Sequence, residues 1–222
     1  MSKKKTRKRN ISKAAIIKAA IKISDDKGLS ALSMRHLSAK LGIEAMSLYN
    51  HVKNKEEILK EIVDSIFKEI KWNNDSSDWR QAMTERAIST RRVLSKHKWA
   101  ISLLESRKDP GPITLKHHDQ VIGCLRRAGF SLPLVATAFS TLDAFLFGYV
   151  MTEQSLPFET EEEAQALAEQ ILAGFPKDAF PNMYEFVAGH VFQPGYSYER
   201  EFLNGLNLVL DSLEEKFRQE KS

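Results

Sequence analysis

The sequence has little cysteine and no unbroken apolar stretch. Cys124 is the one cysteine among 222 residues, so the chain forms no intrachain disulfide and fits a reducing compartment. The longest apolar region, residues 132–151, contains Pro133 and Asp143, which favours a buried helix over a membrane span. The basic N-terminus is not followed by the apolar run of a secretory signal. We therefore predict a cytoplasmic protein that makes no membrane contact.

Short catalytic motifs are missing as well. The sequence contains no Gly-x-Ser-x-Gly elbow, glycine-rich phosphate loop, HExxH or CxxC. Adjacent His117 and His118 diverge by about 100° on a helix, so they cannot ligate one metal from a single face, and we predict a solvated pair. These absences predict a protein that is not an enzyme and has no cofactor and no metal site.

The charge is distributed unevenly along the chain. Residues 1–55 carry 14 Lys and Arg against 3 acidic residues, a net charge of +11, whereas the remainder carries −7. A compact basic module is attracted to a polyanion because each cation placed at a phosphate releases counterions. Charge alone leaves a solubilising tail or anionic lipid as alternatives. We predict that residues 1–10 form a disordered basic arm.

Apolar residues recur with the 3.6-residue period of helices almost throughout, which predicts an all-α protein. Ser12, Ser33 and Asn54 have the features of helix N-caps, and Gly42 suits a left-handed C-cap. The predicted domains cover residues 11–72 and a larger part, residues 73–222, and a shared helix joins them. The predicted helices cover roughly 12–27, 33–41, 44–51, 54–72, 78–95, 97–106, 112–128, 132–155, 160–173, 180–190 and 199–218.

Two short helices around Gly42, preceded by an amphipathic helix, form the pattern of a helix-turn-helix. Leucines and a valine on the inner faces of the two helices fix their angle, and the second helix then presents small and polar side chains outward, as a major groove requires. Beyond it, Lys53 and Lys55 are placed to meet phosphates. The inward residues are Leu37, Leu41, Leu48 and Val52, and the outward ones are Ala45, Met46, Ser47, Tyr49 and Asn50.

Residues 32–59, LSMRHLSAKLGIEAMSLYNHVKNKEEIL, resemble the signature of the tetracycline repressor (TetR) family, including Leu-Tyr-x-His-Val-x-Asn-Lys at 48–55. Weaker similarity continues through Trp79, His97, 128–132 and 146–150. The resemblance implies a homodimer that binds an operator in double-stranded DNA through a three-helix head and an unidentified small-molecule effector through its C-terminal domain. The positions that it implies for DNA contact are Arg35, Ala45, Met46, Ser47, Tyr49, Asn50, His51 and Lys55.

The same resemblance implies an effector pocket in the C-terminal domain. Asp143 stands inside an apolar helix, where burial demands a partner such as Arg86. The position of the magnesium-binding histidine of the tetracycline repressor falls on Leu104 or Glu105, so the imidazole is missing, although a carboxylate at Glu105 has the chemistry to hold a cation. The predicted pocket residues are Arg86, Thr90, Trp99, Ala136, Phe139, Asp143 and Tyr149.

The final helix carries an apolar stripe that predicts an interface. We expect the stripe to be exposed in a monomer and to be covered in a dimer, where the family pairs this helix and the helix at 132–155 with their copies. Such a dimer places two recognition helices about 34–36 Å apart, one turn of DNA. The stripe consists of Phe202, Leu206, Val209, Leu213 and Phe217.

The leading interpretation is a ligand-responsive repressor that an effector releases from a palindromic operator. An architectural DNA-binding protein needs the basic head but no pocket, and the acidic, apolar C-terminal domain argues against it. A small-ligand-binding all-α protein or enzyme is the other alternative, and the missing catalytic motifs argue against the enzyme.

Overall fold

The computed structural model describes residues 11–106, 109–158, 160–193 and 195–222, and within these ranges the chain forms helices and turns with no strand. The all-α fold class is confirmed. The predicted arm at residues 1–10 lies outside the described residues. The chain divides into two compact units, one ending at Phe130 and one running from Ser131 to Ser222, and each is described by itself.

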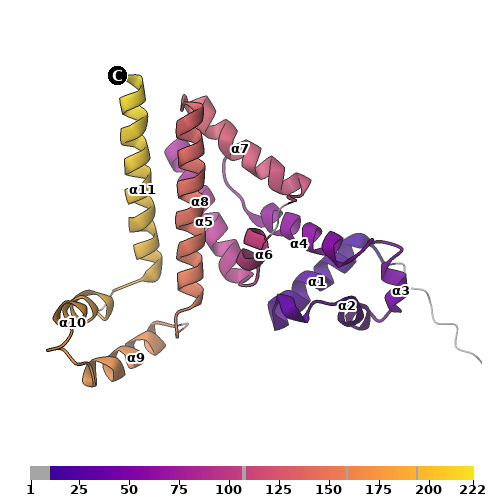
Figure 1. The fold of residues 1–222 in the computed structure, drawn as a ribbon, viewed down its shortest axis with the longest axis horizontal. Helices are drawn as coiled ribbons and strands as arrows, with labels where there is room; N and C mark the ends of the chain where they lie inside the picture. The colour runs from indigo at the N-terminus through magenta and orange to yellow at the C-terminus, as the bar shows by residue number, and fades with distance from the viewer. Residues whose placement is uncertain (1–10, 107–108, 159, 194) are drawn as a thin grey trace, which may run out of the picture. The chain divides into compact units, whose positions relative to one another are not determined.

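The first unit begins with the four helices expected from the sequence, α1 (Lys13–Lys27), α2 (Met34–Leu41), α3 (Ala45–Leu48) and α4 (Lys55–Glu69), with a short 3-10 turn η1 (Leu29–Ala31) after α1 (Figure 1). The predicted caps are confirmed, because Ser12, Ser33 and Asn54 accept hydrogen bonds from the backbone amides of Ala15, His36 and Glu57. Helix α3 is shorter than predicted: a single helical turn that continues as hydrogen-bonded turns to Val52.

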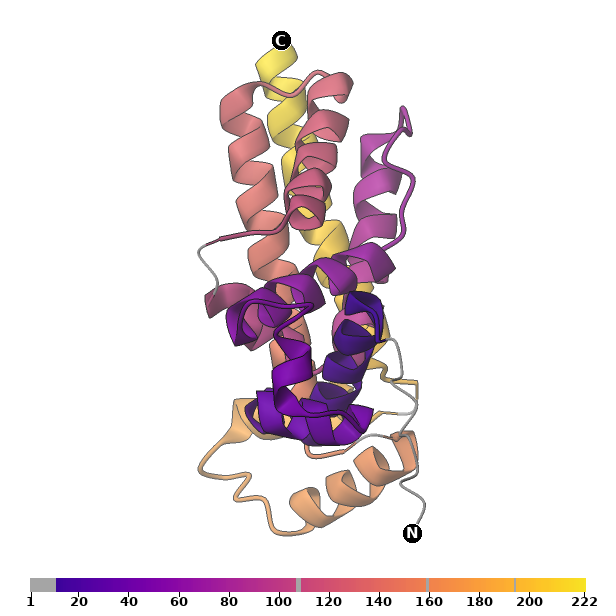
Figure 2. The ribbon, with the colours of Figure 1, turned by 90° about the vertical axis from the view of Figure 1, so that its right-hand side faces the viewer.

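Three further helices complete this unit: α5 (Trp79–Lys96), α6 (Ala100–Ser106) and α7 (Pro112–Ala128). Helix α4 packs on α1, α6 and α7, and it buries apolar side chains along most of its length. The same helix therefore contacts both α1, at the start of the chain, and α6 and α7, further along it (Figure 2).

A buried carboxylate fixes α4 against the start of α7. Asp64 is 5% exposed and accepts hydrogen bonds from the backbone amides of Ile113 (3.2 Å) and Thr114 (3.1 Å) and from the Thr114 hydroxyl (2.8 Å). These amides are the free donors of a helix N-terminus, where negative charge is favoured. Gly111 borders the carboxylate so closely that a Cβ there would lie 2.3 Å from both oxygens.

The second unit contains α8 (Leu132–Gln154), α9 (Glu161–Ala173), α10 (Pro181–Phe186), a π-helical turn η2 (Val187–Val191) and α11 (Tyr198–Lys221). Helices α8 and α11 lie side by side (Figure 1). Glu220, near the end of α11, accepts hydrogen bonds from the hydroxyl (2.6 Å) and the backbone amide (3.3 Å) of Ser131, the N-cap of α8.

The expectation that the α11 stripe is exposed in the single chain is wrong for most of its members. Phe202, Leu206 and Leu213 are buried, while Val209 and Phe217 are half-buried. Ring contacts with Phe145 and Tyr149 of α8 account for Phe202. The stripe is therefore largely a core element of its own chain, because α8 covers it.

Helix α8 leaves a different face uncovered. It is long and apolar enough to cross a membrane by length and composition, with a mean hydropathy of 1.6 over the best window, a test that the core helix of a soluble protein passes equally. Only 33% of that window is buried. The exposed side is built of small side chains at helical spacing, which lets another helix approach closely. Its members are Ala136, Thr137, Ser140, Thr141, Ala144 and Gly148.

The contact between Asp64 and Gly111 yields a stability prediction. Gly111→Ala brings a methyl group onto the Asp64 carboxylate, so α4 and α7 must separate or the carboxylate must lose its hydrogen bonds. We expect a loss of about 2–4 kcal/mol in the free energy of unfolding, measured by urea denaturation. The matched control is Gly174→Ala, where φ is negative and no atom lies within 4 Å of the added methyl. Equal stability of the two variants would contradict the importance of this contact.

Candidate nucleic-acid interface

The turn between α2 and α3 depends on Gly42. Its backbone is left-handed (φ 68°, ψ 37°), and its N–H donates to the carbonyls of Ser38 and Ala39. Ile43 then donates to the Ser38 carbonyl over 3.1 Å. A left-handed residue is inexpensive for glycine, so this position closes α2 and redirects the chain into α3.

The inner faces of the two helices pack as the sequence predicts. Leu37 and Leu48 are fully buried, Val52 is 2% exposed, and Leu41 is half-buried. Leu32 and Ile16 of the neighbouring segments are buried with them. This apolar contact holds α3 as a platform, even though the helix has only one turn of its own.

The opposite face of α3 is open to solvent. Met46 is 73% exposed and Tyr49 47% exposed, unusual values for large apolar side chains unless they meet a partner. Ser47 is half-buried. The remaining predicted contact residues are all exposed: Arg35, Ala45, Asn50, His51, Lys53 and Lys55.

Two acidic side chains of α4 share one cation, a contact that the sequence reasoning missed. Lys13 of α1 binds Glu57 (2.7 Å) and Glu61 (2.6 Å) on α4. The hydrogen bond from Lys13, joined by one from the backbone amide of Lys53, lowers the pKa of Glu57, and the two carboxylates raise the pKa of Lys13. Lys13 therefore balances part of the negative charge of α4, the helix that begins at Lys55.

Among the predicted effector residues, Arg86 and Thr90 are buried on α5. The Arg86 Nε–H donates to Nε2 of His117 over 3.1 Å, and the Thr90 hydroxyl donates to the Arg86 carbonyl over 2.8 Å. The prediction that His117 belongs to a solvated pair is wrong: this side chain is 4% exposed and lies against Phe67 and Trp72. Burial, reinforced by the charge of Arg86, lowers the pKa of His117 to about 3.

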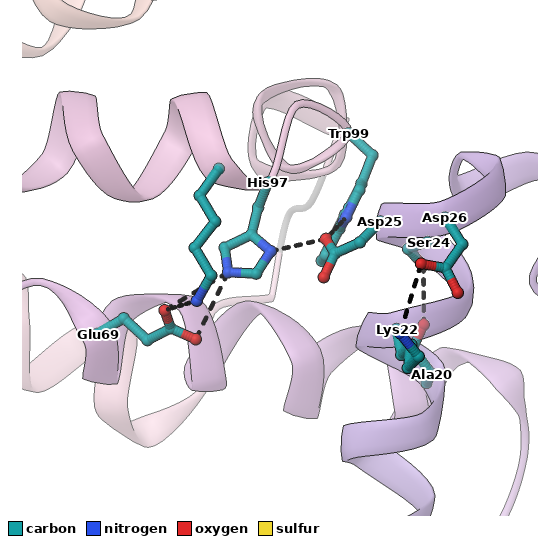
Figure 3. Close-up of polar contacts among 9 residues, drawn as sticks. Ala20, Lys22, Ser24, Asp25, Asp26, Glu69, His97 and Trp99 are labelled. Carbon is teal, nitrogen blue, oxygen red and sulfur yellow. Dashed lines mark hydrogen bonds and ion pairs between the residues drawn. The ribbon is translucent and has the colours of Figure 1, made fainter.

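Trp99 belongs to another cluster. Its indole N–H donates to Asp25 Oδ1 at the end of α1 over 2.7 Å, and the same oxygen lies 2.7 Å from His97 Nδ1 (Figure 3). The other ring nitrogen of His97 faces Glu69, the last residue of α4, at 3.5 Å. The structure thus gives Trp99 a role in fastening α1 to the junction of α5 and α6, a role that no local pattern indicated.

The other predicted effector residues lie on α8, in the second unit. Phe139 and Asp143 are half-buried. The Tyr149 hydroxyl donates to the Tyr198 carbonyl over 2.8 Å, and its ring packs on Tyr198 and Phe202. Of the described residues, no group of three or more His, Cys, Asp or Glu side chains is placed to hold a metal ion. The side chain of Glu105 lies outside what the structure describes.

A groove of about 580 Å³ follows the surface of the first unit, between α1, α4 and the end of α5. None of the predicted effector residues lines it. It is bordered by charged side chains from three helices, including the Asp25, Glu69 and His97 cluster.

Sequence reasoning missed Asp25, Asp64 and His97. The signal for Asp64 was present, because a carboxylate among the apolar residues Ile62, Val63 and Ile66 requires a partner when it is buried. The sequence carried no such signal for Asp25 and His97, because both residues have polar neighbours along the chain.

Comparison with known proteins places these features in a family. Residues 16–62 match the model described as bacterial regulatory proteins, tetR family, and residues 73–217 match the model of the tetracyclin repressor-like C-terminal domain. An HTH-type transcriptional regulator from Saccharopolyspora erythraea is 32% identical over 197 residues, which span 88% of this chain and 81% of that protein. The HTH-type transcriptional repressor DrrR1 of Streptomyces coeruleorubidus is 27% identical, spanning 90% of this chain and 76% of the repressor.

The similarity extends to a solved structure. The TetR family protein ActR of Streptomyces coelicolor, in complex with actinorhodin, superposes with a TM-score of 0.75 at 26% identity. The match covers 92% of this chain and 95% of ActR.

The buried His117 predicts an acid sensitivity. In the folded protein His117 takes up a proton only near pH 3, whereas in the unfolded chain it does so near its ordinary value of 6.5. The unfolded state therefore binds one more proton between these values, and folding loses about 1.4 kcal/mol per pH unit as the pH falls below 6.5. The free energy of unfolding, measured by urea denaturation, should therefore fall between pH 7 and pH 5, and we expect the fall to be about 2 kcal/mol smaller in His117→Gln. The exposed control His51→Gln should keep that loss, and parallel wild-type and His117→Gln profiles would contradict the assignment.

Proposed function

Because the chain belongs to the TetR family of bacterial regulatory proteins, we propose that it is a homodimeric repressor that a small-molecule effector releases from a palindromic operator. Residues 11–72 serve as the DNA-binding domain, and residues 73–222 serve as the effector-binding and dimerisation domain. The observation that carries the proposal is the solvent-exposed outer face of α3, held on a buried apolar platform beside exposed lysines.

The exposed face of α3 suits the edges of bases. The Asn50 amide can donate one hydrogen bond to adenine and accept another from it. The Met46 side chain suits a thymine methyl group. Tyr49 and Ser47 add hydroxyl groups, and Lys55 meets the phosphate backbone at the start of α4. Arg35, Ala45, His51 and Lys53 complete the proposed contact set.

Dimerisation uses the uncovered face of α8. A row of small side chains lets two copies of this helix approach closely, and the row lies on a helix of which most is unburied in one chain. A two-fold pairing brings two recognition helices to one DNA molecule, so the operator is expected to be a palindrome with half-sites about one helical turn apart.

The residues proposed for effector contact are Arg86 and Thr90 in the first unit and Phe139, Asp143 and Tyr149 in the second. ActR, whose structure holds actinorhodin, supports a small-molecule effector in this branch of the family, and DrrR1 supports a repressor. Trp99 donates a hydrogen bond to Asp25. In this proposal it holds the DNA-binding head in place and does not contact the ligand.

Regulators of this family are soluble DNA-binding proteins that generally lack enzymatic activity. We extend this to the present chain and propose that it acts in the cytoplasm without catalysing a reaction. An architectural DNA-binding protein is the second candidate, and specificity for sequence separates the two.

Substitutions on the α3 face should separate base contacts from phosphate contacts. A specific duplex is first selected from a random pool with the purified wild-type protein. Asn50→Ala is then expected to cost about 1–3 kcal/mol on that duplex and little on a scrambled one, whereas Lys55→Ala should weaken both and reduce the salt slope by about one unit. The control is Lys177→Ala, at an exposed position far along the sequence. Failure to enrich any sequence would favour the architectural protein.

The dimer is tested on α8. Ala144→Arg places a long charged side chain in the centre of the exposed small-residue face, where desolvating an unpaired charge costs several kcal/mol if a partner helix covers it. We expect sedimentation to show a monomer with a normal helical circular dichroism spectrum that binds the selected duplex at least tenfold more weakly. Ala14→Arg, an exposed alanine of α1, is the matched control. A stable dimer of Ala144→Arg would place the interface elsewhere.

A further inference from the structure

His97 lies where three helices of the first unit meet. It follows the last residue of α5, and its side chain is almost fully buried between Asp25 at the end of α1 and Glu69 at the end of α4 (Figure 3). Nδ1 is 2.7 Å from Asp25 Oδ1, and Nε2 is 3.5 Å from both oxygens of Glu69. One imidazole therefore joins the helix that begins the DNA-binding head to the helix that leaves it.

The geometry selects one charge state of this ring. A neutral imidazole has one N–H and one lone pair, so it satisfies one carboxylate and turns a lone pair toward the other. The imidazolium donates from both nitrogens, and it brings a positive charge between two negative ones. The arrangement in the structure is complete only with the protonated ring.

The Glu69 carboxylate is held as an anion. Burial by itself raises the pKa of Glu69, but the hydrogen bond from Lys96 (2.7 Å) and the charge of His97 outweigh it, and the pKa is lowered overall. Asp25 accepts the Trp99 indole N–H on the same oxygen that faces His97. A loss of the ring proton is therefore not compensated by a proton on Glu69.

The two carboxylates of the cluster are open to solvent. The cluster forms part of the wall of the groove between α1 and α4, and the side chains of Asp25 and Glu69 are 30% and 38% exposed. The other charged groups that face this groove are three lysines of α1, Lys68 and Glu61 of α4, and Lys96 of α5. The three lysines are Lys13, Lys18 and Lys22.

We propose that His97 is a proton-dependent latch of the DNA-binding head. The protonated ring holds α1 and α4 against the junction of α5 and α6 in the arrangement that binds the operator. Deprotonation removes one of its two carboxylate bonds, and the head then moves more freely and binds the operator less tightly. The latch rests on the proposed function and adds pH as a second input, independent of the effector.

Operator affinity as a function of pH tests the latch. The duplex selected with wild-type protein is titrated at constant ionic strength between pH 6 and pH 8.5. We expect the wild-type affinity to fall about tenfold as the pH rises, which is the scale of one hydrogen bond to a charged group. His97→Gln should give a flat profile near the high-pH affinity of the wild type. His51 is an exposed histidine on the proposed DNA face, and the His51→Gln variant should still lose affinity as the pH rises, because His97 is intact.

A second variant shows whether the effect of His97→Gln comes from misfolding. A measurement without DNA tests the latch even if the proposed function is wrong. Asp25→Asn keeps an oxygen for the Trp99 N–H but removes the charge at Nδ1, so its affinity profile should move to lower pH. Hydrogen exchange of the α1 and α4 amides in the DNA-free protein should quicken with pH, after correction for intrinsic exchange, in the wild type but not in His97→Gln.

The outcomes are distinguishable. If no duplex is bound specifically at any pH but the exchange difference is present, the proposed function fails and the latch stands as a structural device. If the imidazole nitrogen spectrum shows His97 neutral at pH 6, or if wild type and His97→Gln share one pH profile and one exchange pattern, the latch is wrong.

Discussion

The buried carboxylate of Asp64 is the constraint on which the first unit depends. A charge that is 5% exposed is tolerated only when its hydrogen bonds are made, and Asp64 makes them to the free amides at the start of α7. Gly111 has no side chain to separate the two. Helix α4 is therefore fixed at its middle to α7, and its two ends are then available to hold other parts of the molecule in place.

Each end of α4 carries a carboxylate with a different task. Near the first turn, Glu57 binds Lys13 and the backbone of Lys53, which joins α1 to the segment that follows the recognition helix. At the last turn, Glu69 faces His97 and Lys96, which joins the same helix to the end of α5. A displacement of α4 at any one of these three points must be accommodated at the other two, because the helix between them is a rigid rod.

This arrangement explains how a helix as short as α3 can serve as the proposed DNA-binding surface. One turn of α3 has almost no stability of its own, and its outward side chains are left exposed. Its geometry comes from the buried leucines beneath it and from α2, on which it packs. In the proposed function, control of DNA binding requires no change in the outward side chains of α3, only a change in the helices that hold them.

The sequence by itself determined the features that depend on neighbours a few residues apart. Helix spacing, the caps at Ser33 and Asn54, the left-handed Gly42 and the outward face of α3 were all predictable, because each follows from local backbone chemistry and from a short apolar period. The family resemblance rested on the same contiguous segment.

Only the tertiary structure decided which distant groups meet. His97 and Asp25 are 72 residues apart, Arg86 and His117 are 31 apart, and neither pair carries a local signal of the other. The α11 stripe was recognised as apolar, but a stripe does not state whether its own chain or a second copy covers it, and here α8 covers most of it. The physical reason is one of range: periodicity and capping arise from contacts within a few residues, whereas a hydrogen-bond partner or a covering helix is chosen when the whole chain packs.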